Sequence, residues 1–239
     1  MSKKLKTRGM NIIGIDETNN RFTSNRYKYN LPMVVAGYLS FADDKHHIEE
    51  EAVKGGVFRK IGKPATEVLN FAKAYLMKNS HFYYCCLRRK DYQRTSDKTI
   101  DELDYLSQRA RAISAIVFRF FTSYKLSQDN TVAILDKMDF KDFSENVISH
   151  TKQILEIAGI SNLGIIAREK ADKQSPPVRK ADRVAYCICS IIFKGMHHEI
   201  ANWTKGNRQV GISNTVLKDL SSRLKYPTPT DLDDFAYFS

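Results

Sequence analysis

The sequence of 239 residues lacks any long apolar run, which excludes a large class of proteins. No stretch reaches the roughly 18 consecutive apolar residues that a membrane-spanning helix needs. The basic first residues are not followed by the apolar segment and small-residue cleavage site of a secretory signal peptide. We therefore expect a globular protein of the cytoplasm with no membrane partner.

Cysteine is scarce, and its spacing does not fit a zinc site. Cys85 and Cys86 are adjacent, and Cys187 and Cys189 are one residue apart, whereas zinc sites use the C-x₂-C spacing. Both pairs lie in apolar segments, so we expect small buried side chains in a reducing compartment. A glycine-rich phosphate loop of the G-x-x-x-x-G-K-[ST] type is also absent, which argues against a phosphotransferase.

Acidic residues are outnumbered by basic ones. The chain carries 38 Lys and Arg against 27 Asp and Glu, which gives a net charge of +11. Such an excess favours a polyanionic partner, most simply nucleic acid. The 42% hydrophobic content excludes a disordered polymer and is enough to fill the core of one large α/β domain.

Hydrophobic periodicity predicts strands that alternate with helices. The expected strands are 11–17, 31–39, 81–87, 131–136 and 163–167. The expected helices are 46–54, 65–78, 101–124, 143–158, 177–194 and a short one at 210–224. This order predicts an α/β fold with a five-stranded mixed sheet flanked by helices. We expect one domain over 1–198, followed by a C-terminal extension over 199–239 that packs on the same domain.

Two of the apolar strands end on carboxylates. The strand 11–17 ends on Asp16 and Glu17, and the strand 131–136 ends on Asp136. A buried carboxylate is costly unless a cation, an ion pair or hydrogen bonds compensate it, and oxygen ligands at a strand end attract Mg²⁺. The pattern therefore predicts acidic groups that converge at one edge of the sheet.

Two further acids lie around the start of the last predicted helix. Asp172 precedes this helix, and Asp182 lies within its first turns. Ala181 and Ala185 lie one turn apart, so their small face lets the helix approach the sheet and brings Asp182 towards the strand ends. Each acid also has an ordinary interpretation as a cap, a loop residue or, for Asp182, a partner of Arg179. We favour a shared site.

The order of the elements is that of the ribonuclease H-like fold, and particular segments resemble two groups with this fold. Residues 134–139, 143–147 and 170–176 resemble the second half of archaeal type 2 ribonuclease H. The Asp-Glu-Thr-Asn opening at 16–19, the strand at 33–38 and the helix at 180–186 resemble the DUF3800 family of ribonuclease H-like proteins.

These resemblances imply a metal-dependent nuclease. Type 2 ribonuclease H implies Asp16, Glu17, Asp136 and Asp172 as catalytic ligands of two Mg²⁺ or Mn²⁺ ions, and DUF3800 implies Asp16, Asp136 and Asp182. The choice between Asp172 and Asp182 as the last ligand stays open. The implied reaction is two-metal hydrolysis of phosphodiester bonds in RNA, RNA–DNA hybrid or DNA. The alternatives are a non-catalytic nucleic-acid-binding protein on the same scaffold and a structural subunit.

One departure from the type 2 ribonuclease H pattern leaves the class of nucleic acid that serves as substrate undetermined. That family follows its Asp-Glu pair with a Gly-Arg-Gly element that holds the ribonucleotide, whereas residues 18–21 here are Thr-Asn-Asn-Arg. Without glycine the backbone is not expected to approach a ribose closely. Lys173, Arg179 and Arg183 are expected to bind the phosphates of flanking nucleotides, with a solvated helix face as the other interpretation. The sequence does not indicate the oligomeric state.

Overall fold

The structure is a computed structural model of the chain, and it describes residues 9–18, 33–42, 65–87, 98–137, 143–193, 195–196, 198–204, 206 and 208–210. Its elements are β1 (Asn11–Thr18), β2 (Met33–Ser40), α2 (Ala65–Lys78), β3 (Phe82–Leu87), α3 (Lys98–Tyr124), β4 (Thr131–Asp136), α4 (Phe143–Ile157), β5 (Gly164–Arg168), α5 (Ala171–Gln174), α6 (Pro176–Phe193) and α7 (Glu199–Trp203). The five predicted strands and four of the predicted helices are present, with ends that differ by a few residues. The sequence did not predict α5 or α7. The helices expected at 46–54 and 210–224 lie outside the described residues.

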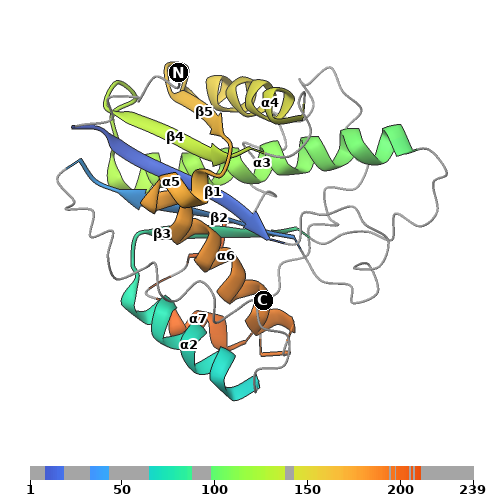
Figure 1. Cartoon of the computed structure of the whole chain (residues 1–239). Coiled ribbons are helices and arrows are strands. Elements are labelled where there is room, and N and C mark those ends of the chain that lie inside the picture. Colours follow the sequence, from blue (N-terminus) through green and yellow to red (C-terminus); the bar gives the residue numbers. More distant parts are fainter. Residues whose placement is uncertain are drawn as a thin grey trace.

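The five strands form one mixed sheet in the order β3-β2-β1-β4-β5. The pairs β1–β2 and β2–β3 are antiparallel, whereas β1–β4 and β4–β5 are parallel. Helices cover both faces, with α3 behind the sheet and α6 in front of it in the view of Figure 1. This is an α/β fold of the ribonuclease H-like type, and the predicted fold class is confirmed.

The residues of β1 alternate between the two faces of the sheet, as they do in any regular strand. Ile13 and Ile15 belong to the same core cluster as Ile113 and Phe120, which are side chains of α3. Ile12 packs on the other face, in a cluster with Val178 of α6. Odd-numbered positions of β1 therefore face α3, and even-numbered positions face α6.

The helix α6 lies directly on β1 and β2 because small residues stand at the contact. Ala181 and Ala185 are fully buried in a core cluster with Val34 and Ala36 of β2. The predicted small face of this helix is thereby confirmed. On the strand side, Gly14 leaves room for the start of α6, since a Cβ atom there would collide with the backbone at Pro177.

We expect Gly14→Ala to destabilise the protein by roughly 1–3 kcal/mol, because the colliding atoms are backbone and cannot rotate away. Urea unfolding of the two proteins measures the difference. Gly164→Ala is the matched control, because a Cβ there would lie at an ordinary 3.6 Å from Val132 Cγ2. Equal stability of the Gly14 variant and the wild type would contradict the close approach of α6.

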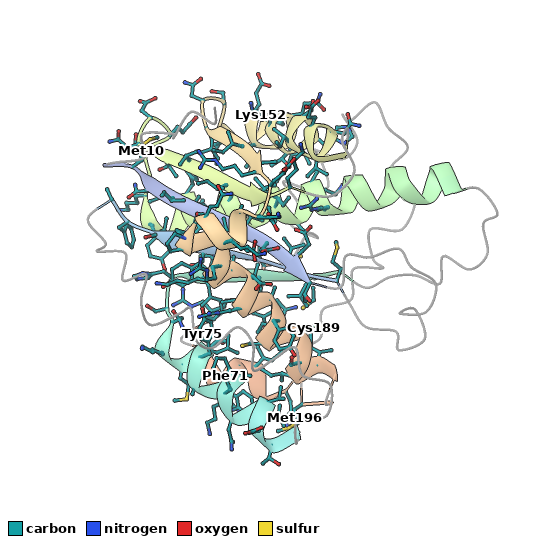
Figure 2. All side chains as sticks on the ribbon, viewed as in Figure 1. Met10, Phe71, Tyr75, Lys152, Cys189 and Met196 are labelled. Atoms are coloured by element: carbon teal, nitrogen blue, oxygen red, sulfur yellow. The ribbon has the colours of Figure 1, made fainter. Side chains whose placement is uncertain are left out.

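The helix α7, in the region predicted to be a C-terminal extension, packs on α2 and α6. Ile200 and Trp203 of α7 are buried in the core cluster that contains Leu76 of α2 and the buried side of α6. Figure 2 shows Phe71, Tyr75, Cys189 and Met196 around α2 and the end of α6, and these side chains pack against that cluster. The backbone also pairs at the sheet edge, where the Val210 N–H donates to the Tyr84 carbonyl over 2.8 Å. Residues 211–239 lie outside the described part.

The cysteines are free thiols, and three of the four are buried. Burial raises the pKa of Cys85 to about 12 and that of the partly buried Cys189 to about 11. The thiols are therefore protonated at neutral pH, and the prediction of small buried side chains is confirmed for Cys85, Cys86 and Cys187. No helix in the described part of the chain is long and apolar enough to cross a membrane.

Candidate functional site

Asp16 is a buried carboxylate near the end of β1. As an even-numbered residue it lies on the α6 face of the sheet, and only 8% of its surface is exposed. Its Oδ1 atom accepts a hydrogen bond of 2.7 Å from the Glu17 N–H. Burial raises the pKa of Asp16 well above 3.8, and the nearby charges of Glu17, Asp182 and Asp136 raise it further. Asp16 therefore lies among three other acids.

The described part of the chain provides no ion-pair partner for this carboxylate. Among the described residues, no Lys, Arg or His forms an ion pair with Asp16. An ionised carboxylate that is buried beside other acids is unfavourable until a cation or a proton joins it. Groups with strongly shifted pKa values of this kind cluster at functional sites.

Asp136 lies at the same edge of the sheet as Asp16. The parallel ladder between β1 and β4 ends on the pair Ile15 and Leu135, and the two aspartates follow that pair. Burial raises the pKa of Asp136, the hydrogen bond from Ala171 opposes this rise, and the charges of Asp172 and Glu17 add to it. The structure therefore brings together the two strand ends that the sequence singled out.

The short helix α5 orients Asp136. The Ala171 N–H donates a hydrogen bond of 2.7 Å to the Asp136 Oδ1 atom. Lys170, which precedes α5, has a left-handed backbone with φ of 53°, and this conformation starts the turn that brings Ala171 back to β4. Asp172 follows on α5, half-buried, close enough for its charge to raise the pKa of Asp136.

Arg179 holds α5 against α6. Its Nε atom donates to the Asp172 carbonyl and its Nη2 atom donates to the Lys173 carbonyl, each over 2.8 Å. Arg179 was expected to bind phosphate, but two of its guanidinium N–H groups donate to backbone carbonyls instead. Lys173 is exposed and Arg183 is half-buried on α6. The described geometry gives Arg179 a structural task, which the sequence did not predict.

Asp182 comes to the site from α6. It follows Ala181, which is fully buried against the sheet, and it is itself half-buried. Its charge is one of the causes of the raised pKa of Asp16. The close approach of α6, which the two alanines and Gly14 permit, thus places this carboxylate near β1.

Glu17 lies on the opposite face of the sheet from Asp16. Its Oε1 atom forms an ion pair with Arg109 on α3 and lies 2.6 Å from the Nη2 atom of that residue. The Glu17 side chain is 3% exposed and the Arg109 side chain is 2% exposed. The sequence analysis missed Arg109. A signal was present, because Arg109 lies three residues after Leu106 and four before Ile113, on the apolar stripe of this helix.

The acids lie near one another, but those in the described part of the chain are not arranged as a complete metal site. In the part of the chain that the structure describes, no group of three or more His, Cys, Asp and Glu side chains is placed to hold a metal ion. The donor chemistry nevertheless fits a hard cation, since carboxylate oxygens suit Mg²⁺ and Mn²⁺.

The sheet order and the helices on both faces give the chain an α/β fold of the ribonuclease H-like type. No family model matches the chain, and no curated protein matches it significantly. A ribonuclease H2 structure from Pyrococcus horikoshii OT3 is similar at 13% identity and a TM-score of 0.47, covering 90% of this chain and 98% of that chain. Ribonuclease HII of Archaeoglobus fulgidus, in a complex with PCNA, is similar at 18% identity and a TM-score of 0.39, covering 87% and 84% of the two chains. Similarity at these values concerns the fold and assigns neither a substrate nor a reaction to this chain.

Proposed function

We propose that this protein is a divalent-metal-dependent nuclease that hydrolyses phosphodiester bonds in RNA, RNA–DNA hybrid or DNA. One observation carries the proposal most directly. Asp16 is buried, has a raised pKa because of burial and neighbouring acids, and forms no ion pair among the described residues. A carboxylate in this state fits a place that a cation occupies during function.

Carboxylates from three elements would hold the metal. Asp16 from β1, Asp136 from β4 and Asp182 from α6 are the proposed ligands, with Asp172 from α5 as a further one. When bound, Mg²⁺ or Mn²⁺, in one or two sites, would supply an activated water and stabilisation of the leaving oxygen. The DUF3800 resemblance and the type 2 ribonuclease H resemblance both include Asp16 and Asp136.

The remaining residues of the site support binding and orientation. The Ala171 N–H fixes the direction of the Asp136 carboxylate, and Arg179 fixes α5 through two backbone carbonyls. The side chains of Lys170 and Lys173 on this turn are exposed. Together with the net charge of +11, they favour binding of a phosphate backbone near the acids.

A second candidate is a nucleic-acid-binding protein without catalysis on the same scaffold. The observation that favours it is the lack, among the described residues, of a group of three ligands placed for a metal. Such a protein would bind nucleic acid with a strong dependence on salt, and Mg²⁺ or chelator would leave this binding unchanged. Metal dependence therefore separates the two candidates.

The proposal is tested with labelled RNA, DNA and hybrid substrates in the presence of Mg²⁺ or Mn²⁺. We expect the wild-type protein to cut at least one class of substrate and Asp136→Asn to cut it at least about 100-fold more slowly. Loss of a residue that only hydrogen-bonds to a metal ligand already lowers metal affinity or activity by roughly 10–100-fold. Asp129→Asn, an exposed acid just before β4, is the matched control and should cut normally.

The outcomes of this assay are distinct. Cutting that disappears with chelator and with the Asp136 variant supports the nuclease and names its substrate. Tight, salt-sensitive binding by both proteins without any cutting supports the binding protein. Cutting that survives Asp136→Asn unchanged would show that the acids described here are not the active site.

A further inference from the structure

Arg168 ends β5 at the same edge and on the same face of the sheet as Asp136. The parallel ladder between β4 and β5 pairs these two residues, and paired residues of neighbouring strands point to the same face. The pair Ile134 and Ile166, two residues earlier, identifies the face, because both side chains pack in one cluster with Val178 of α6. Arg168 therefore brings a long cationic side chain to the border of the acidic site.

Several other cations around the acids are engaged with the protein itself. The Lys137 Nζ atom lies 3.5 Å from the Glu169 Oε1 atom. On α6, Arg179 donates to two backbone carbonyls, and the Lys180 Nζ atom lies 4.8 Å from the centre of the Tyr38 ring. These contacts occupy the cationic groups and leave them less suited to bind a phosphate.

Arg168 and two lysines after it are not engaged in this way. Within the ranges that the structure describes, the side chains of Arg168, Lys170 and Lys173 form no ion pair, hydrogen bond or ring contact. Arg168 is half-buried, and both lysines are exposed. Glu169, the acid between Arg168 and Lys170, is already paired with Lys137. The turn from β5 to α5 thus presents three cationic groups to an anionic ligand.

This turn is held in place beside Asp136. The Ala171 N–H donates to the Asp136 Oδ1 atom over 2.7 Å, and the Lys137 N–H donates to the Arg168 carbonyl over 2.8 Å. Ala171 is also fully buried. In Figure 1, α5 and α6 follow one another in front of the sheet. An anion bound by the side chains of the turn would therefore lie in a defined position relative to the carboxylates.

We propose that Arg168, together with Lys170 and Lys173, binds a backbone phosphate of the nucleic-acid substrate, so that the substrate strand crosses the turn from β5 to α5 and does not follow α6. The proposal rests on the function proposed above and makes it more specific, because it assigns the side of the metal site on which the nucleic acid lies. The sequence analysis did not include Arg168 among the phosphate-binding residues. A guanidinium suits this task, since its planar donors can bind two phosphate oxygens at once.

The test measures binding of labelled RNA, DNA and hybrid duplexes to the full chain by fluorescence anisotropy. Chelator prevents cutting, and KCl is varied between about 50 and 200 mM. We expect folded Arg168→Gln to bind the preferred duplex at least about tenfold more weakly, because a charge-assisted hydrogen bond is lost. The slope of log affinity against log salt should become shallower by about one, since one phosphate contact is missing. A merely structural role of Arg168 would leave this slope unchanged.

Three further variants make the result specific. Arg119→Gln removes the same charge from an exposed position on α3, across the sheet, and should leave affinity and slope nearly unchanged. Lys180→Gln tests the path along α6 and should also have little effect. Arg168→Lys keeps the charge, so it should keep the salt slope, but it should lose part of the affinity because an ammonium group cannot bind two oxygens side by side.

Cleavage in Mn²⁺ provides an independent measurement. Arg168→Gln should raise KM more than it lowers kcat, because a phosphate contact remote from the reacting bond acts equally on the bound substrate and the transition state. Loss of both affinity and salt slope in Arg168→Gln without any cutting by the wild type would support the phosphate site and refute the nuclease. The two proposals can therefore fail separately.

Four results would overturn the inference. They are unchanged affinity and slope in folded Arg168→Gln, equal losses in Arg168→Gln and Arg119→Gln, a loss in Lys180→Gln that exceeds the loss in Arg168→Gln, and no binding of any duplex by the wild type. Where Arg168→Gln does not fold, Arg168→Lys decides, because wild-type affinity in that variant would contradict binding of two phosphate oxygens by the guanidinium.

Discussion

Asp16→Asn is expected to abolish cleavage and, at the same time, to make the metal-free protein more stable at pH 8. Burial and neighbouring acids raise the pKa of Asp16 in the folded protein above its unfolded value of about 3.8. A raised pKa contributes stability that is present below the unfolded pKa and is lost as the pH rises through the folded pKa. Asparagine has nearly the same shape as aspartate but carries no charge, so the variant does not lose this stability as the pH rises.

Urea unfolding in the presence of chelator at pH 3.5 and pH 8 measures the effect. The two proteins should have similar free energies of unfolding at the low pH. At pH 8 the variant should be more stable by about 1–2 kcal/mol, the usual size of a stabilising change at a functional site. Asp129→Asn is the control and should show no gain. A variant that is less stable than the wild type at pH 8 would mean that the ionised Asp16 is favourably placed without metal.

Arg109→Met is expected to cause the largest loss of stability of any single change considered for this protein. It leaves the Glu17 carboxylate buried at the end of β1 without its ion pair to α3. Removal of one partner from a buried ion pair costs about 3–5 kcal/mol, because the remaining charge stays in a poorly solvated place. Thermal unfolding at pH 7 measures this loss.

The double variant Glu17→Met with Arg109→Met separates lost charge from lost packing. It should recover most of the stability, since apolar side chains of similar volume can replace a buried pair at little cost. Arg119→Met is the matched control, because Arg119 lies on the same helix and is exposed. Equal losses in the single and double variants would show that Arg109 acts through packing and not through its charge.

The sequence was sufficient to predict the five strands of the sheet and the placement of two aspartates at strand ends. Strand periodicity located all five strands, and Asp16 and Asp136 were expected at strand ends because an apolar run stops at each of them. The spacing of Ala181 and Ala185 correctly indicated a helix face that packs closely on the sheet. These features are local, so they can be read from neighbouring residues.

The contacts that the sequence did not reveal join segments far apart in the chain. The partner of Glu17 is 92 positions away, and an arginine on an apolar helix stripe has many possible partners. Arg179 was expected on a solvated or phosphate-binding face, yet it bonds two backbone carbonyls of α5. The helix α5 has only four residues and therefore no periodicity to detect.

The stability of the wild-type protein in a titration with Mn²⁺ and Mg²⁺ tests the central claim most directly. If the acids on β1, β4 and α6 form a cation site, metal at about 100 times its dissociation constant should add about 2.7 kcal/mol of stability. For a chain of this size this corresponds to a rise of roughly 5–10 °C in the unfolding temperature. Chelator should reverse the rise, and Asp16→Asn should not show it. An unfolding temperature that stays constant over the whole titration would contradict the metal site and, with it, the proposed nuclease.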